Sequence, residues 1–139
     1  MKKIVAGLFA AILSTAGLVA LTSTVPAAAA CTEYVCVTTK TNATAPKSVF
    51  VGSVVKIKVA VTAPSGNAPV RGSLVVKMTG PGGFKKTVTA NYNNKSVLLS
   101  MGKLKKPGKY SYTAKFTGVE GYRNSQDSGV VVVKKRRQA

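Results

Sequence analysis

Few side chains in this chain could carry out chemistry. The sequence holds two cysteines, three acidic residues and no histidine. The acids, Glu33, Glu120 and Asp127, fall in terminal or loop segments and form no pair that could act as general acid and base. Without histidine, no base is at hand to activate a serine or cysteine nucleophile. The sequence therefore predicts a protein that is not an enzyme and that has no cofactor or metal.

The two cysteines, Cys31 and Cys36, have a structural interpretation. A metal site would need further ligands, and the chain has no other cysteine and no histidine to supply them. In an exported protein a disulfide is the expected state of such a pair, although a loop this short is stabilised only modestly. One alternative stays open: Cys31 could instead carry a lipid as the first residue of the mature chain.

The first thirty residues are typical of an export signal. Two lysines precede an apolar run over residues 4–21, and small alanines stand before Cys31 where signal peptidase requires them. No later apolar run is long enough to cross a membrane. We therefore expect residues 1–30 to be removed and the product to be secreted, extracellular or associated with the cell wall.

Basic residues dominate the charge, with 21 Lys and Arg against 3 acids and a net charge of +18. If each strand reverses the one before it, the connections alternate between two ends of the molecule. One end then collects ten of the basic residues, and the three acids fall at the other. The predicted polyanion-binding residues are Lys85, Lys86, Lys103, Lys105, Lys106, Lys109, Lys134, Lys135, Arg136 and Arg137.

Such a cationic end attracts polyanions by releasing their counterions. The candidate partners are anionic cell-wall polymers, other polyanions such as lipid head groups or extracellular DNA, and a protein partner. Sequence-specific reading of nucleic acid is not expected, because the chain has neither a recognition helix nor a run of stacking aromatics. The remaining strand lysines have a solubilising interpretation: Lys56, Lys58, Lys77 and Lys115.

The elements that must position these charges are strands. Valine and threonine are frequent, apolar residues alternate with polar ones, and turn signals recur every eight to twelve residues. This pattern is typical of an all-β sandwich of about seven strands. The expected strands are 35–40, 53–62, 73–79, 84–90, 95–101, 109–116 and 129–134.

Three segments resemble the bacterial Ig-like domain repeat family of secreted and surface proteins. They are GSVVKIKVAVTAPSGNAPVRGSLVVK (residues 52–77), LKKPGKYSYTAKF (residues 104–116) and FTGVEGYRNSQDS (residues 116–128). The resemblance implies an Ig-like antiparallel β-sandwich over residues 51–134. An N-terminal segment, residues 31–50, would hold the disulfide loop and a first strand, and residues 135–139 would form a basic tail.

The resemblance also implies a structural role for Tyr110 as a tyrosine corner, whose hydroxyl bonds to the backbone just upstream. Taken together, these features predict a secreted, strongly basic Ig-like binding or interaction module at the cell surface. The alternatives are a purely structural Ig-like unit of the surface or matrix, and a cationic antimicrobial or inhibitor protein. An Ig-like fold hosts many functions, so the resemblance implies architecture far more than role.

Overall fold

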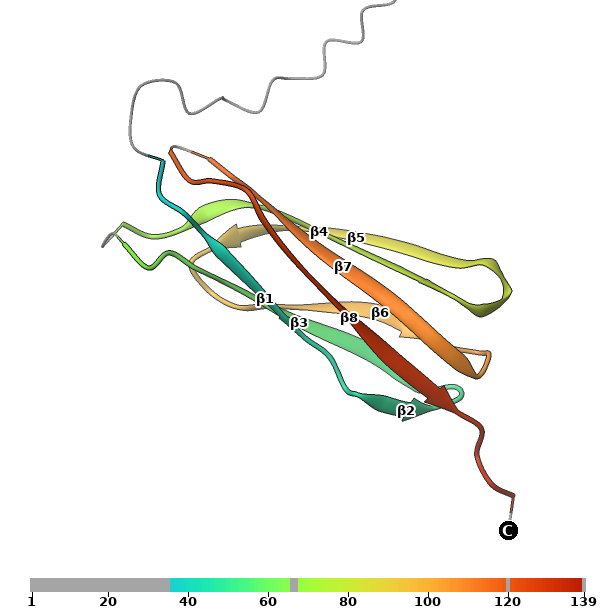
Figure 1. Ribbon diagram of the computed structural model, residues 1–139. Coiled ribbons are helices and arrows are strands. Elements are labelled where there is room, and N and C mark those ends of the chain that lie inside the picture. Colours follow the sequence, from blue (N-terminus) through green and yellow to red (C-terminus); the bar gives the residue numbers. More distant parts are fainter. Residues whose placement is uncertain (1–35, 66–67, 120, 139) are drawn as a thin grey trace, which may run out of the picture.

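The protein is a two-layer β-sandwich, described in a computed structural model for residues 36–65, 68–119 and 121–138. Eight strands make up the two sheets, with a short 3₁₀ turn, η1 (Pro81–Gly83), between the fourth and fifth (Figure 1). The strands are β1 (Lys40–Thr44), β2 (Ser48–Phe50), β3 (Val54–Thr62), β4 (Arg71–Gly80), β5 (Phe84–Asn93), β6 (Val97–Lys103), β7 (Gly108–Gly118) and β8 (Ser125–Lys134).

One sheet has the order β1-β3-β6 and the other the order β2-β8-β7-β4-β5. Neighbouring strands are antiparallel except β2 and β8, which run parallel. Between β1 and β2 the chain passes from the first sheet to the second, so the N-terminal strand contributes to both layers. This arrangement confirms the predicted Ig-like sandwich. The predicted signal lies outside the described residues, and within the described ranges no helix is long and apolar enough to span a membrane.

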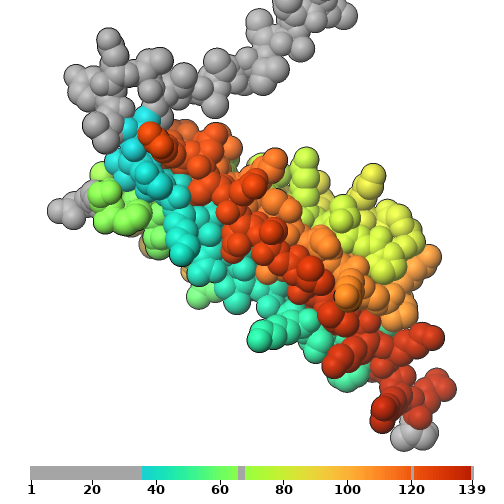
Figure 2. Space-filling view, viewed as in Figure 1, coloured from blue at the N-terminus to red at the C-terminus, as the bar shows by residue number. Residues whose placement is uncertain are grey.

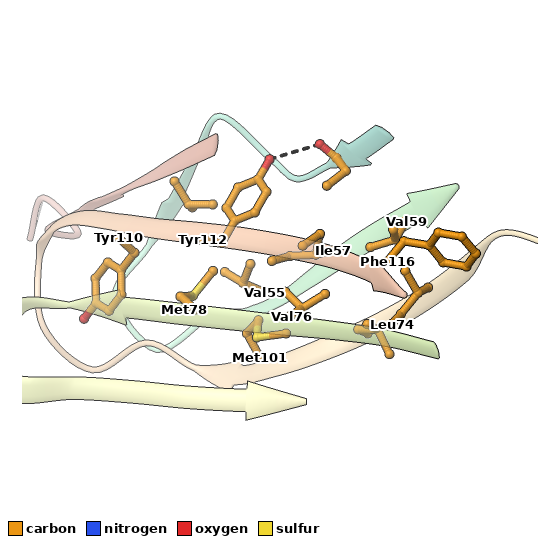
Figure 3. Packing of buried hydrophobic residues seen from close by; sticks show 14 of the residues in the cluster. Val55, Ile57, Val59, Leu74, Val76, Met78, Met101, Tyr110, Tyr112 and Phe116 are labelled. Carbon is orange, nitrogen blue, oxygen red and sulfur yellow. Dashed lines mark hydrogen bonds between the residues drawn. The ribbon is translucent and has the colours of Figure 1, made fainter. Parts of the chain in front are cut away.

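The core forms where the alternating apolar residues of the two sheets face each other (Figure 3). In β3 every second residue is buried, from Val55 to Val61, while the lysines between them are exposed. The same period of two buries Leu74 to Met78 in β4 and Tyr110 to Phe116 in β7. These three faces are the ones that the sequence pattern predicts, because a strand places successive side chains on opposite sides.

The N-terminal part differs from the prediction. Of the predicted strand 35–40, residues 36–39 form no regular strand, and Val37 makes only an isolated bridge to Tyr122. The strand β1 begins at Lys40, and β2 was not predicted at all. Both strands precede the expected boundary at residue 51, yet both are hydrogen-bonded members of the sheets. Their sequences, KTNAT and SVF, are too short and too polar to show a clear apolar period.

Asp127 also differs from the prediction, because it lies within β8 and not in a loop. It occupies a half-buried, inward-facing position, where one carboxylate oxygen accepts a 2.8 Å hydrogen bond from the Ala43 N–H and the other accepts one from the Ser128 N–H. Asp127 therefore fastens β1 to the neighbouring β8. Glu33 and Glu120 fall outside the described residues.

Tyr112 of β7 adds a second fastening of β1 to the five-stranded sheet. Its hydroxyl donates to the Ala43 carbonyl oxygen over 3.2 Å (dashed line in Figure 3). Burial, with a smaller effect from the negative charge of Asp127, raises the pKa of the Tyr112 hydroxyl above its usual value. The tyrosine is therefore held in its neutral, hydrogen-bonding form.

Candidate polyanion-binding pole

The basic residues named in the sequence analysis gather at one end of the sandwich. We call this set of ten residues the basic pole: Lys85, Lys86, Lys103, Lys105, Lys106, Lys109, Lys134, Lys135, Arg136 and Arg137. Figure 1 shows the β4–β5 turn, the β6–β7 loop and the C-terminal segment at the same end of the molecule. The strand register places them there, since Gly80 pairs with Phe84 at the turn and Gly108 pairs with Val133 near the end of β8.

Tyr110 joins the connections that carry these charges. Its ring is buried, packs edge-on against Phe84 with 5.3 Å between ring centroids, and lies where a side chain at Gly80 would stand. Its hydroxyl donates a 2.9 Å hydrogen bond to the carbonyl oxygen of Lys106. This is the geometry of a tyrosine corner, and it ties the β6–β7 loop to the β4–β5 turn.

Backbone hydrogen bonds bring the β2–β3 connection to the same end. The Val51 N–H donates to the carbonyl oxygen of Lys134 at 2.9 Å, and the Gly52 N–H donates to that of Leu104 at 2.8 Å. The left-handed φ of Gly52, 86°, is a conformation that residues with a Cβ rarely adopt. The β2–β3 turn is therefore hydrogen-bonded to both the β6–β7 loop and the end of β8. The sequence analysis did not predict that this turn lies at the pole.

All ten side chains of the basic pole are exposed. Asp127 is the single carboxylate side chain within the described ranges, and both of its oxygens already accept backbone hydrogen bonds. It stands seven residues from Lys134 along β8, or about 23 Å at the usual rise of a strand. That separation exceeds the Debye length of about 8 Å at physiological salt. Asp127 therefore does little to neutralise the pole.

The ten residues do not point in one direction. Lys85 and Lys109 lie on the outer face of the five-stranded sheet: Lys85 has the parity opposite to the half-buried Phe84, and Lys109 stands next to the buried Tyr110. Lys86 occupies an inward-facing position of the edge strand β5. Its amino group lies beside Gly102 of β6, in the other sheet. The C-terminal segment from Lys135 projects from the end of the molecule (Figure 2). The pole is thus a cationic cap that wraps the end of the sandwich.

Phe50 lies beside the basic pole, a position that the sequence analysis did not predict. Half of its side chain is exposed (52%), it pairs with Lys134 across β2 and β8, and it lines a shallow hollow together with the basic residues 134–137. A second hollow, on Val51 and Pro107, also borders the C-terminal segment. The only available signal was the apolar triplet at residues 49–51, which has no period to assign a face.

The described residues contain no group of three or more metal-ligating side chains. Cys36 lies at the start of the described part of the chain and Cys31 lies outside it, so their disulfide, and the alternative of a lipid on Cys31, remain predictions. The described side chains include no acid–base pair, and the charge that they expose at the pole is positive.

No family model matches the chain, and no curated protein matches it. Solved structures do resemble it. A PKD domain of an M14-like peptidase from Thermoplasmatales archaeon SCGC AB-540-F20 is 20% identical, with a TM-score of 0.49 over 68% of this chain and 94% of that one. A conjugative transposon lipoprotein from Bacteroides eggerthii is 8% identical, with a TM-score of 0.48 over 67% and 95%.

The CARDB domain of a Pyrococcus furiosus protein, solved with two metal ions, is 18% identical, with a TM-score of 0.47 over 74% of this chain and 100% of that one. These likenesses are distant, and they carry no information about what this chain binds. The Ig-like fold rests on the strand order and register described above.

Proposed function

We propose that the chain is an exported, non-enzymatic Ig-like binding module whose basic pole holds anionic polymers of the cell wall. The observation that carries the proposal is the exposure of all ten cationic side chains at one end, with no free carboxylate near them in the described part of the chain. Cations crowded in this way repel each other, and a polyanion relieves that repulsion while releasing its own counterions.

The pole suits a flexible polymer better than a small ligand. Its charges come from three connections and wrap the end of the sandwich, and the hollows beside them are shallow and open. Small-molecule sites are usually enclosed and largely apolar. Lysines also act as point charges on mobile stems, so they can follow successive phosphates of a chain without demanding one geometry.

The test compares two triple variants of the chain from Cys31 onward, the form expected after signal cleavage. In the pole variant, Lys135→Gln, Arg136→Gln and Arg137→Gln remove three charges beyond the end of β8. In the control variant, Lys40→Gln, Lys56→Gln and Lys58→Gln remove three exposed charges from the outer face of the other sheet. Both variants lose the same charge, and none of the six substitutions touches the core.

The measurement is co-sedimentation with Gram-positive cell walls over a salt series, before and after chemical removal of their phosphate polymers. The pole variant is expected to bind at least about tenfold more weakly, with a salt slope lower by about 2, since each phosphate contact contributes roughly 0.7 to that slope. Equal loss in both variants would mean that net charge alone acts. No binding by the unaltered chain at low salt would overturn the proposal and favour a purely structural role.

A further inference from the structure

Three lysines on the outer face of the five-stranded sheet form a straight path. In the register, Lys77 of the central strand β4 stands opposite Thr87 of β5 on one side and Thr113 of β7 on the other. Lys85 of β5 is displaced from Lys77 by two residues in one direction, and Lys115 of β7 by two residues in the other. We call Lys85, Lys77 and Lys115 the lysine diagonal.

The spacing along the diagonal is regular. Each step crosses one strand, about 4.8 Å, and moves two residues along the strand, about 6.8 Å, which places successive Cα atoms about 8 Å apart. Because β5, β4 and β7 are consecutive neighbours in the sheet, both steps run in the same sense. All three side chains are exposed. The charges therefore form a row and not an isolated pair.

Hydroxyl groups flank this row. Thr79 stands directly opposite Lys85, and Thr87 and Thr113 stand on either side of Lys77. Threonine hydroxyls donate to phosphate oxygens as readily as to water. The outward positions of β4, β5, β7 and β8 hold no aromatic side chain and no acid, since Asp127 takes the inward parity. The outer face of these four strands can therefore contact phosphates but offers no platform on which sugars or bases could stack.

The diagonal continues from the basic pole, because Lys85 belongs to both sets. The outer face of the three-stranded sheet provides a contrast. There Lys56 and Lys58 are two residues apart on the single strand β3, opposite Ser100 and Leu98, and Leu98 is 59% exposed. Lys103 of β6, opposite Val54, and Lys40 of β1, opposite Thr62, lie toward the two ends of that face, so its lysines are unequally spaced and form no straight diagonal over three strands. The two faces thus have similar lysines in different arrangements.

We propose that a linear phosphodiester polymer, once held by the basic pole, runs along the lysine diagonal with its phosphates on Lys85, Lys77 and Lys115. This inference rests on the proposed function and makes it more specific: the ligand is an extended chain of phosphodiesters, and the outer face of the five-stranded sheet is the second half of its site. Short oligomers occupy the pole alone, whereas longer ones reach both parts.

The experiment measures binding of synthetic glycerol-phosphate oligomers of three and twelve units by fluorescence anisotropy over a salt series. The diagonal variant is Lys77→Gln with Lys115→Gln, and the matched control is Lys56→Gln with Lys58→Gln. For the twelve-unit oligomer, the diagonal variant is expected to bind about tenfold more weakly, and its salt slope should fall by about 1.4, because two contacts at roughly 0.7 each are lost. The three-unit oligomer should bind both variants alike. Replacing the same two lysines by arginine should preserve binding of the long oligomer.

Each outcome decides between the parts of the site. If the diagonal and control variants lose equally little with the twelve-unit oligomer while the pole variant loses strongly, the pole binds the polymer and the diagonal does not. If the pole variant also binds normally, the proposed function itself fails. If the diagonal variant weakens both oligomers equally, the lysines act through the general field of the protein, and the extended path is wrong.

Discussion

The two ends of the sandwich are held together by partly different means. At the basic pole, one buried aromatic ring and backbone hydrogen bonds fasten the connections, through Tyr110, Val51 and Gly52. At the opposite end, the buried rings of Tyr92 and Phe116 pack edge-on with 5.8 Å between centroids, backbone hydrogen bonds also join the connections, and polar side chains add further bonds. Thr39 Oγ1 donates to the Arg123 carbonyl oxygen at 2.7 Å and lies 2.8 Å from the hydroxyl of Ser125.

Further side-chain hydrogen bonds join the connections at the opposite end. The hydroxyl of Thr41 lies 2.7 Å from that of Ser125, and the hydroxyl of Tyr122 donates to the Ala68 carbonyl oxygen at 3.0 Å. Asp127 extends this polar fastening along β8. The comparison shows why charge can collect at the pole. The contacts described there involve no charged side chain, and the lysines and arginines of the pole are exposed.

The largest expected effect comes from removing the ring that organises the pole. Tyr110→Ala should lower the free energy of unfolding by about 4 kcal/mol, because it empties a fully buried aromatic site. Tyr110→Phe keeps the ring and loses the bond to Lys106, so it should cost about 1 kcal/mol. Denaturant unfolding followed by circular dichroism measures both values. A cost below about 1.5 kcal/mol for the alanine variant would show that the ring does not organise this end.

A smaller effect is expected where polar side chains fasten the strands. Asp127→Ala leaves the Ala43 N–H without its acceptor, and this should lower the free energy of unfolding by about 2 kcal/mol. The neighbouring change Gln126→Ala, at an exposed position on the outer face, is the control and should alter stability by less than about 0.5 kcal/mol. Amide hydrogen exchange at Ala43 should accelerate in the Asp127 variant alone. Unchanged protection there would contradict the fastening role.

The smallest effect is expected in the pH dependence of Tyr112. Its pKa is raised in the folded chain, so its contribution to stability is complete below the unfolded value of about 10 and is lost as pH rises toward the folded pKa. Tyr112→Phe should cost about 1 kcal/mol at pH 7 through the lost bond to Ala43, and the difference from the unaltered chain should shrink between pH 9 and pH 12. A difference that stays constant over this range would show that Tyr112 titrates alike in both states.

The long strands could be predicted from the sequence, whereas the short ones could not. In β3, β4 and β7 the period of two is maintained by valine, leucine and tyrosine, and burial of each face follows directly from it. In β1 the inward residues are Thr41 and Ala43, whose small or polar side chains carry no such signal. These residues are buried because β8 lies against β1, which is a long-range contact that no local pattern reports.

The sequence by itself determined the fold class, the excess of positive charge and the end at which ten of the basic residues collect. The alternation of apolar and polar residues predicts which face of a strand is buried. Short connections between strands predict at which end of the sandwich each turn lies, so both follow from local rules. Tertiary structure alone decided the partners of Asp127, the place of Phe50 and the alignment of Lys85, Lys77 and Lys115. Each of these depends on register between strands that are distant in the chain, and register is set by how the two sheets pack and not by any one strand.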